Sequence, residues 1–161
     1  MDQVESLCAV LGDEARVCGV LTAVLREEQQ AVIRLRPQAI LACVEQRQAL
    51  HDELTRLAGL RRALVRDVAT ERGAPTESAT ALVPLLPPDP QARLRSRVRS
   101  LRRALLEARG LERQNGLLVE ASLDTVSDLL RALAGLVPGA RYGADARFAP
   151  PVANDRIDRR V

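Results

Sequence analysis

The sequence predicts an all-α fold: an elongated antiparallel bundle of three long helices with coiled-coil-like packing, one short crossover helix and a flexible C-terminal tail. Apolar residues recur at steps of three, four and seven along three long segments, which is typical of helices that pack as coiled coils. The 161 residues include no Trp, one Tyr and one Phe, so the core must consist of aliphatic residues, chiefly Leu, Val and Ala. Such a core suits helices better than strands. We therefore expect one helical domain at 1–137 and a tail at 138–161.

The first helix is expected over residues 3–35. Its apolar seam is Val4, Leu7, Leu11, Cys18, Leu21, Leu25, Val32 and Leu35. Two further seam positions carry the acids Glu14 and Glu28, so those turns should lie near an open end or a polar contact. Pro37 then separates this helix from the next, because proline is tolerated in a first helical turn but costs about 3 kcal/mol in a helix interior.

The second helix is expected over residues 38–72. It ends near Arg72-Gly73, where glycine can supply a left-handed C-cap. The crossover 73–89 is rich in proline and cannot form a long helix. Within it, residues 76–83 could form one short helix that Thr76 caps. The apolar seam of the second helix is Ile40, Val44, Leu50, Leu54, Leu57, Leu64 and Val68.

The third helix is expected over residues 90–137, with Asp89 and Pro90 as its N-cap and first residue. It stops before Pro138-Gly139. The tail that follows is rich in Pro, Gly, Asp and Arg, and we expect it to be mobile or to become ordered only on a partner. The seam of the third helix is Leu94, Val98, Leu101, Leu105, Ala108, Glu112, Asn115, Val119, Ser122, Val126, Leu129, Leu133 and Leu136.

The motifs of most enzyme and cofactor classes are missing from the sequence. It has no phosphate-binding loop, no dinucleotide-binding glycine motif and no Cys/His cluster with metal spacing, so we expect no catalysis, cofactor or metal. Cys8, Cys18 and Cys43 are expected to be buried free thiols. The N-terminal region carries acids where a secretory signal would be basic, and no apolar run approaches 18 residues. We therefore expect a cytoplasmic protein without membrane insertion.

Two features leave alternative functions open. His51 precedes Leu54 and Ala58-Gly59, a loose likeness to phosphotransfer domains, although an ordinary boundary histidine is the favoured interpretation. Arg93 to Arg103 holds six arginines in eleven residues and could bind phosphates. No aromatic residues are interleaved for base stacking, so a solvated helix face is favoured over nucleic-acid binding.

The segment QNG, in the middle of the third helix, is the most unusual feature of the chain. Asn115 stands on the apolar seam, where a buried Asn lowers stability but fixes register or partner choice. Gly116 removes a side chain, which would let another backbone approach, and costs about 1 kcal/mol of helix stability. The helix after it is apolar nearly all the way round, so it needs more than one neighbour. The spare neighbour is expected to be another protein.

These late elements resemble the FlgN-type flagellar export chaperones of type III secretion. The family has long N-terminal helices, a proline-interrupted crossover, a late N-x-x-N-G-x-L-[LI]-like motif and a Tyr-Gly element in the tail. Here the late motif reads Glu112-Arg113-Gln114-Asn115-Gly116-Leu117-Leu118, so Glu112 replaces the first Asn of the motif. The tail element reads Arg141-Tyr142-Gly143-Ala144-Asp145.

The resemblance implies a cytoplasmic chaperone that binds the C-terminal helical segments of hook-filament junction proteins (FlgK and FlgL), prevents their premature assembly and delivers them to the export apparatus. It implies docking of Tyr142, with Gly143, on the export-gate protein FlhA. Monomer and homodimer are both compatible with the heptads, and the alternative function is a coiled-coil scaffold that forms homo-oligomers through the same apolar face. The substrate contacts implied by the resemblance are Asn115, Gly116, Leu117, Leu118, Val119, Ser122, Leu123 and Val126.

Overall fold

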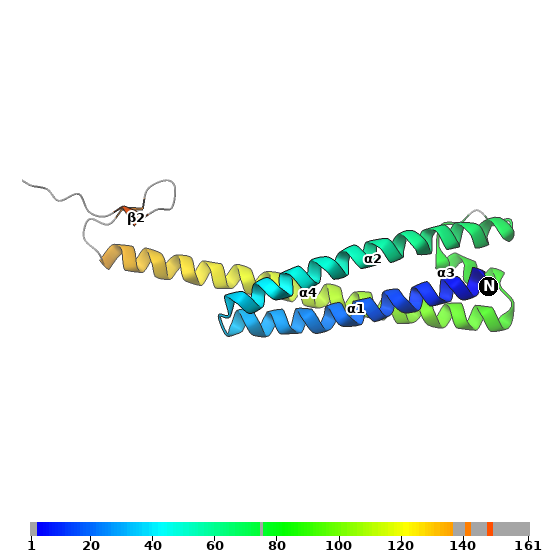
Figure 1. Ribbon diagram of the computed structural model, residues 1–161, viewed down its shortest axis with the longest axis horizontal. Coiled ribbons are helices and arrows are strands. Elements are labelled where there is room, and N and C mark those ends of the chain that lie inside the picture. The colour runs from blue at the N-terminus through cyan, green and yellow to red at the C-terminus, as the bar shows by residue number, and fades with distance from the viewer. Residues whose placement is uncertain (1–2, 75, 137–140, 143–147, 150–161) are drawn as a thin grey trace, which may run out of the picture. The chain divides into compact units, whose positions relative to one another are not determined.

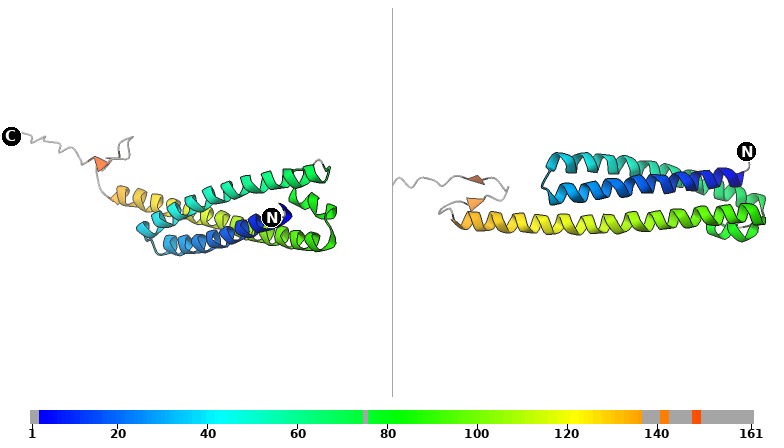
Figure 2. Two further views of the ribbon diagram at one scale, coloured as in Figure 1. Left: turned by 45° about the vertical axis from the view of Figure 1, so that its right-hand side comes forward. Right: turned by 90° about the horizontal axis from the view of Figure 1, so that it is seen from below.

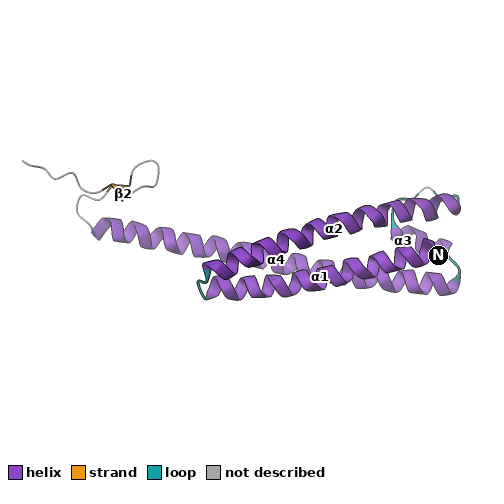
Figure 3. Cartoon of the chain, in the orientation of Figure 1, coloured by secondary structure: helices purple, strands orange, loops and turns teal. Residues whose placement is uncertain are grey.

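The computed structural model describes residues 3–74, 76–136, 141–142 and 148–149, and these are mainly helical (Figure 1; Figure 3). The chain divides into two compact units, Met1–Leu118 and Val119–Val161. The predicted all-α class is confirmed. The elements are α1 (Gln3–Ile33), α2 (Pro37–Glu71), α3 (Ala79–Leu82), the 3-10 turn η1 (Val83–Leu85), α4 (Pro88–Leu136), β1 (Arg141–Tyr142) and β2 (Phe148–Ala149).

In the first unit, α1 and α2 lie side by side in opposite directions (Figure 1; Figure 2). The turn between them differs from the prediction, because α1 ends at Ile33 rather than at Leu35. Leu35 is 77% exposed and has a φ of 50°, the left-handed conformation that side chains disfavour. The amide of Leu35 donates a hydrogen bond to the carbonyl of Val32 at 3.1 Å, and the amide of Arg36 donates one to the carbonyl of Ala31 at 2.9 Å. This pair of bonds is a Schellman motif that ends the helix with a leucine in the place where glycine is usual.

The end of α2 has the predicted glycine cap. Gly73 has a φ of 62°, and its amide donates to the carbonyl of Thr70 at 3.1 Å. The amide of Ala74 donates to the carbonyl of Ala69 at 2.9 Å, which completes a second Schellman motif. One seam prediction in α2 was wrong, because Val44 is 39% exposed whereas its neighbour Cys43 is buried.

The crossover into α4 differs from the prediction in detail. Its short helix covers Ala79–Leu82 and has Ser78, not Thr76, at its N-cap. The Thr76 hydroxyl instead accepts a hydrogen bond from the Ser78 amide at 3.2 Å, so it forms a local turn. α4 begins at Pro88, two residues earlier than expected, because both Pro88 and Pro90 fall in the first turn, where amide donors have no helical partner.

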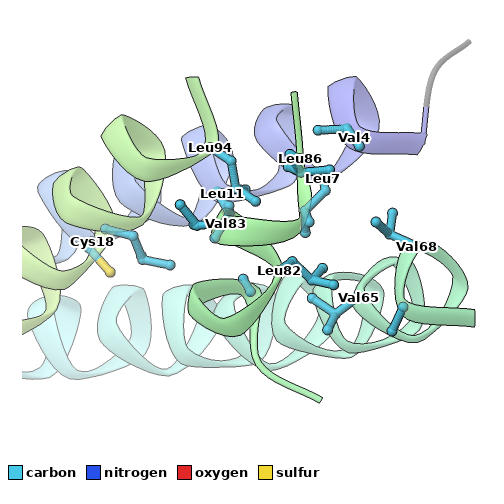
Figure 4. Packing of buried hydrophobic residues seen from close by; sticks show 13 residues of the cluster. Val4, Leu7, Leu11, Cys18, Val65, Val68, Leu82, Val83, Leu86 and Leu94 are labelled. Carbon is cyan, nitrogen blue, oxygen red and sulfur yellow. The ribbon is translucent and has the colours of Figure 1, made fainter. Parts of the chain in front are cut away.

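The core of the first unit is formed where α1, α2, the crossover and the beginning of α4 meet (Figure 4). α1 contributes more than one seam: besides the predicted positions it buries Val17 and Val24. A helix that packs between two neighbours must bury this wider face. The largest fully buried side chains are Leu7, Leu11, Leu25, Leu82, Leu94, Val65, Val68 and Cys18.

α1 and the first part of α4 run in the same direction. Glu5 lies 3.4 Å from Arg93 near the beginning of both helices. Arg26 lies 2.7 Å from Glu107, further along both. α4 therefore continues alongside α1 up to the region of Asn115, which carries the candidate site.

The second unit contains the last turns of α4 and the strand pair β1–β2. The strands are antiparallel, with Arg141 opposite Ala149 and Tyr142 opposite Phe148. This pair was not predicted. The aromatic residue in each strand is the local signal that favours extended structure. Mobility of residues 138–161 stays a prediction, as does the single domain at 1–137.

Candidate partner-binding surface

Asn115 is buried, with 2% of its surface exposed, and it faces α1. Its Nδ2 donates hydrogen bonds to the carbonyl of Leu25 at 2.7 Å and to Oε2 of Glu28 at 3.1 Å. Its Oδ1 is buried with no partner in the described residues. Asn115 therefore fixes the register of α4 against α1 within the chain, while its direct contact with a partner protein stays a prediction.

The two acids on the α1 seam occupy polar contacts, as predicted. Glu28 is 4% exposed. Besides the hydrogen bond from the Asn115 amide, it forms an ion pair with Arg47 at 3.2 Å. Glu14 is 3% exposed, and Nε of Arg61 lies 2.9 and 3.1 Å from its two oxygens. Both pairs join α1 to α2. A buried carboxylate is tolerated only with such partners, since an unpaired one would lose its hydration without compensation.

Gly116 does not mark a close approach between the described helices. It is exposed, and a Cβ atom added there would have no heavy atom within 4 Å other than its own helix and chain neighbours. The cost of glycine in a helix, about 1 kcal/mol, is therefore not offset by any packing within the described part of the chain. The space beside Gly116 is open to another molecule.

The apolar positions of α4 are buried in the first unit and exposed in the second. Leu94, Leu101, Ala108 and Asn115 are spaced by seven and are 0, 7, 3 and 2% exposed. The next residue of the series, Ser122, is half-buried, and the one after, Leu129, is 59% exposed. The neighbouring apolar positions after residue 118 are exposed as well: Val119 38%, Leu123 64%, Val126 48%, Leu130 47% and Leu133 58%.

We call Val119, Ser122, Leu123, Val126, Leu129, Leu130 and Leu133 the open seam. Because residues at steps of three, four and seven share one face of a helix, the open seam lies on one face of the part of α4 that belongs to the second unit. The six Val and Leu side chains of the open seam are exposed, and a stripe of exposed apolar residues of this kind marks an interaction site.

The other residues with predicted partner contacts are Leu117, Leu118, Tyr142 and Gly143. Leu118 is half-buried. Leu117 is 59% exposed but follows Asn115 by two residues, which is about 200° around a helix, so it lies on the face opposite the buried seam. Tyr142 has its backbone in β1, and Gly143 lies outside the described residues. The structure thus does not bring Tyr142 and the open seam into one described site.

His51 has a structural contact that the sequence did not predict. Its Nε2 lies 3.0 Å from Oε1 of Glu112, so it joins α2 to α4. This contact agrees with the interpretation of His51 as an ordinary histidine at the boundary of the core. In the Arg93–Arg103 segment all six arginines are exposed, and only Arg93 has an ion pair with another described residue, Glu5. This agrees with the favoured interpretation of a solvated helix face.

The three cysteines are free thiols, as predicted, although Cys8 is only half-buried. Burial, together with the carboxylates of Glu14 and Glu112, raises the pKa of the Cys18 thiol. Across the residues that the structure describes, no group of Cys, His, Asp and Glu side chains could hold a metal ion. No described helix combines the length and the apolar character needed to cross a membrane.

Comparison with known proteins identifies one family. A sequence model of the family described as FlgN protein matches residues 1–149, which include both the Asn115-Gly116 segment and Tyr142-Gly143. No curated protein and no solved structure matches the chain significantly.

Proposed function

Because the chain belongs to the FlgN family of flagellar export chaperones, we propose that it binds the C-terminal helical segments of hook-filament junction proteins of the FlgK and FlgL type. The chaperone would act in the cytoplasm, prevent premature assembly of these proteins and deliver them to the export apparatus. The arrangement we propose for this task is an elongated antiparallel bundle over residues 1–137 and a flexible tail over 138–161.

The observation that carries the proposal is the exposure of the open seam. In the first unit the seam of α4 from Leu94 to Asn115 is covered by other helices, whereas the Val and Leu side chains of the open seam in the second unit are exposed. We propose that an amphipathic helix of a partner lies along the open seam. This is helix-in-groove recognition, in which apolar anchors at helical spacing supply the affinity.

The magnitude of the apolar gain fits a reversible chaperone. Six half-exposed Val and Leu side chains would gain about 1 kcal/mol each on becoming buried, since full burial of such a side chain contributes about 1.5–3 kcal/mol. A partner helix that buries a matching apolar face would roughly double this gross gain to about 12 kcal/mol. The loss of translational and rotational freedom, at least about 4 kcal/mol, must be subtracted from it. The remainder of about 8 kcal/mol corresponds to micromolar binding rather than to a permanent complex.

The tail has a separate proposed role. We propose that Tyr142 and Gly143 dock on the export-gate protein FlhA, so that substrate binding and delivery use different parts of the chain. Tyr142 is the single tyrosine, and an amphipathic ring is a frequent interface anchor. A chain truncated after Pro138 should therefore keep its affinity for substrate peptides and lose binding to the gate protein.

The test is a calorimetric titration with peptides from the C-terminal helices of junction proteins. Wild type should bind with micromolar affinity and a negative heat-capacity change, which reports burial of apolar surface. Val126→Asp should weaken binding by at least about tenfold, because it would bury an unpaired carboxylate. Val20→Asp is the matched control, since Val20 is similarly exposed, at 45% against 48% for Val126, but lies on α1. Equal loss in both variants, or no binding by wild type, would contradict the proposal.

A further inference from the structure

The turn between α1 and α2, in the first unit, combines backbone strain with exposed aliphatic side chains. Leu35 is 77% exposed and has the left-handed backbone that leucine disfavours. Ile33 before it and Leu41 after it are exposed as well, at 58% and 64%. We call residues 33–41 the turn patch. It lies at the end of the α1–α2 pair that is away from the N-terminus (Figure 1).

The turn patch is basic and contains no acid. Arg34 and Arg36 are exposed, and neither forms an ion pair with another described residue. No Asp or Glu occurs from residue 29 to residue 44. Glu28, just before this stretch, is buried and already paired with Arg47. The two arginines therefore have no local anion to neutralise them.

The surface beside the turn patch is hollowed. A depression of about 310 Å³ includes Arg34, Arg36 and the small Ala39 in its lining, together with one acid, Glu27. Arg26 lines it too, but this arginine forms an ion pair with Glu107 at 2.7 Å. Arg34 and Arg36 are thus the cations that remain to bind an anionic group in this depression.

Hydrogen bonds hold the backbone of the turn in one conformation. The amides of Arg34 and Arg36 donate to the carbonyls of Gln30 and Ala31, at 3.1 and 2.9 Å. Because these donors are satisfied within the chain, the turn can leave water without losing backbone hydrogen bonds. Leu35 gives the described fold no packing in return for its strain. Strain of this kind is typical of functional positions.

We propose that the turn patch docks the chain on the surface of an anionic lipid bilayer. Ile33, Leu35 and Leu41 enter the boundary between headgroups and acyl chains, and Arg34 and Arg36 bind lipid phosphates. The binding is peripheral, since no described helix could cross a membrane. Aliphatic side chains mixed with arginines are the composition of membrane-surface anchors. A contact with an acidic protein would not require three aliphatic side chains exposed to water.

The Arg93–Arg103 segment is a second basic surface, but it lacks the aliphatic part. Its Leu94 and Leu101 are buried, and its Val98 is half-buried. This segment can attract anions but has no exposed aliphatic side chain to enter a bilayer. It therefore provides the control that separates docking by the turn patch from general attraction of a basic protein to an anionic surface.

This inference goes beyond the proposed function and does not rest on it. The turn patch belongs to the first unit, whereas the open seam belongs to the second. Its test uses the full chain and lipid vesicles and needs no junction-protein peptide. A chain that binds vesicles but no peptide, or peptide but no vesicles, would separate the two proposals.

The first experiment is co-sedimentation of the full chain with vesicles made from equal parts of phosphatidylglycerol and phosphatidylcholine. Wild type should bind these vesicles at low salt, should bind less as salt is added, and should not bind vesicles of phosphatidylcholine alone. The double variant R34Q/R36Q should bind at least about tenfold more weakly, because each arginine near an anionic surface contributes about a factor of five. R99Q/R103Q changes the net charge equally and should bind nearly as well as wild type.

Leu35→Asn tests the aliphatic part. Asparagine tolerates the left-handed backbone, so the turn should keep its conformation while binding to the mixed vesicles falls about tenfold. Leu106→Asn is the matched control, since Leu106 is 60% exposed on α4, and its binding should equal that of wild type. Circular dichroism should show the same helicity in both variants, because both side chains are exposed.

A tryptophan reporter locates the docking surface. The chain has no Trp, so Gln38→Trp introduces a single one at an exposed position of the turn patch. Its fluorescence should shift to the blue when vesicles with phosphatidylglycerol are added, because the ring leaves water. Leu106→Trp is the control reporter and should show no shift.

Three results would overturn the proposal. Wild type might be found not to bind the mixed vesicles at low salt. R34Q/R36Q and R99Q/R103Q could lose equal affinity while Leu35→Asn loses none, which would mean general charge attraction. The turn-patch variants could instead weaken binding to poly-glutamate with no vesicle binding by wild type, which would assign the patch to an acidic protein.

Discussion

Asn115 and Glu28 form a buried polar contact between α4 and α1: the Asn115 amide donates to the Glu28 carboxylate at 3.1 Å, and to the carbonyl of Leu25 at 2.7 Å. Glu28 in turn receives Arg47 from α2. One buried network therefore joins the three long helices near the last covered position of the α4 seam. Its polar geometry allows only one register, whereas Leu and Ala alone could slide by a turn.

Removal of the Asn115 amide should destabilise the protein. Asn115→Ala leaves the Leu25 carbonyl without this donor and removes one of the two partners of Glu28, so the free energy of unfolding should fall by about 1–3 kcal/mol. Urea denaturation measures the change. Gln114→Ala removes an exposed amide from the neighbouring position and should change stability by less than about 0.5 kcal/mol. If the two variants were equally stable, the network would have no role in holding α4.

Leu35 offers a stabilising substitution. Its left-handed backbone costs a leucine about 1 kcal/mol relative to glycine, and its exposed side chain contributes no packing to the core. Leu35→Gly should therefore raise the free energy of unfolding by about 0.5–1 kcal/mol. Leu35→Ala keeps the strained conformation and should give no such gain. The converse change, Gly73→Ala, should lower stability by about 1 kcal/mol without any steric clash, because the space around Gly73 is open.

Replacement of Gly116 should have opposite effects on stability and on partner binding. Gly116→Ala puts a better helix former where a Cβ meets no neighbour, so the free energy of unfolding should rise by about 0.5–1 kcal/mol. If a partner helix uses this opening, the same variant should bind junction-protein peptides less tightly. Gly59→Ala on α2 should give the same gain in stability with unchanged affinity, since that glycine is equally open. Unchanged affinity in Gly116→Ala would mean that the partner does not approach there.

Stability should fall at alkaline pH because of Cys18. The pKa of its thiol is raised above the ordinary value of 9.0 by burial and by nearby carboxylates. The unfolded chain therefore releases the thiol proton at a lower pH than the folded chain does. The stabilising contribution is complete below the unfolded pKa and is lost as pH rises towards the folded pKa, by up to about 1.4 kcal/mol per pH unit. Burial also raises the pKa of the Cys43 thiol, so Cys18→Ala should lose only the part of the fall that is due to Cys18. Parallel curves of stability against pH for the two proteins would contradict the assignment.

The periodic part of the fold was predictable because it depends on local spacing. Glu14 and Glu28 interrupted the α1 seam, and both proved to be buried polar contacts. Their partners were not predictable, since Arg61 is 47 positions from Glu14 and only the docking of α2 selects it. The end of α1 was misjudged for a related reason: Leu35 fits the seam, but the tight turn into Pro37 requires a left-handed residue there, and the chain uses leucine.

The candidate site was predictable only in part. The sequence located the unusual segment at Asn115-Gly116 and the apolar helix after it. It could not distinguish a residue that faces α1, such as Asn115, from one on the opposite side, such as Leu117, because the helix is apolar around most of its circumference. The strand pair of Tyr142 with Phe148 depends on pairing across a turn, and a two-residue strand has too little periodicity to be recognised.

Amide hydrogen exchange of the protein with and without a bound junction-protein peptide tests the central claim most directly, because it reports protection along α4 residue by residue. Binding on the open seam predicts new protection over residues 119–133 and little change over residues 94–108, which are already covered by α1. Protection confined to α1 and α2, or none at saturating peptide, would contradict the claim that the exposed continuation of the α4 seam is where the chaperone holds its substrate.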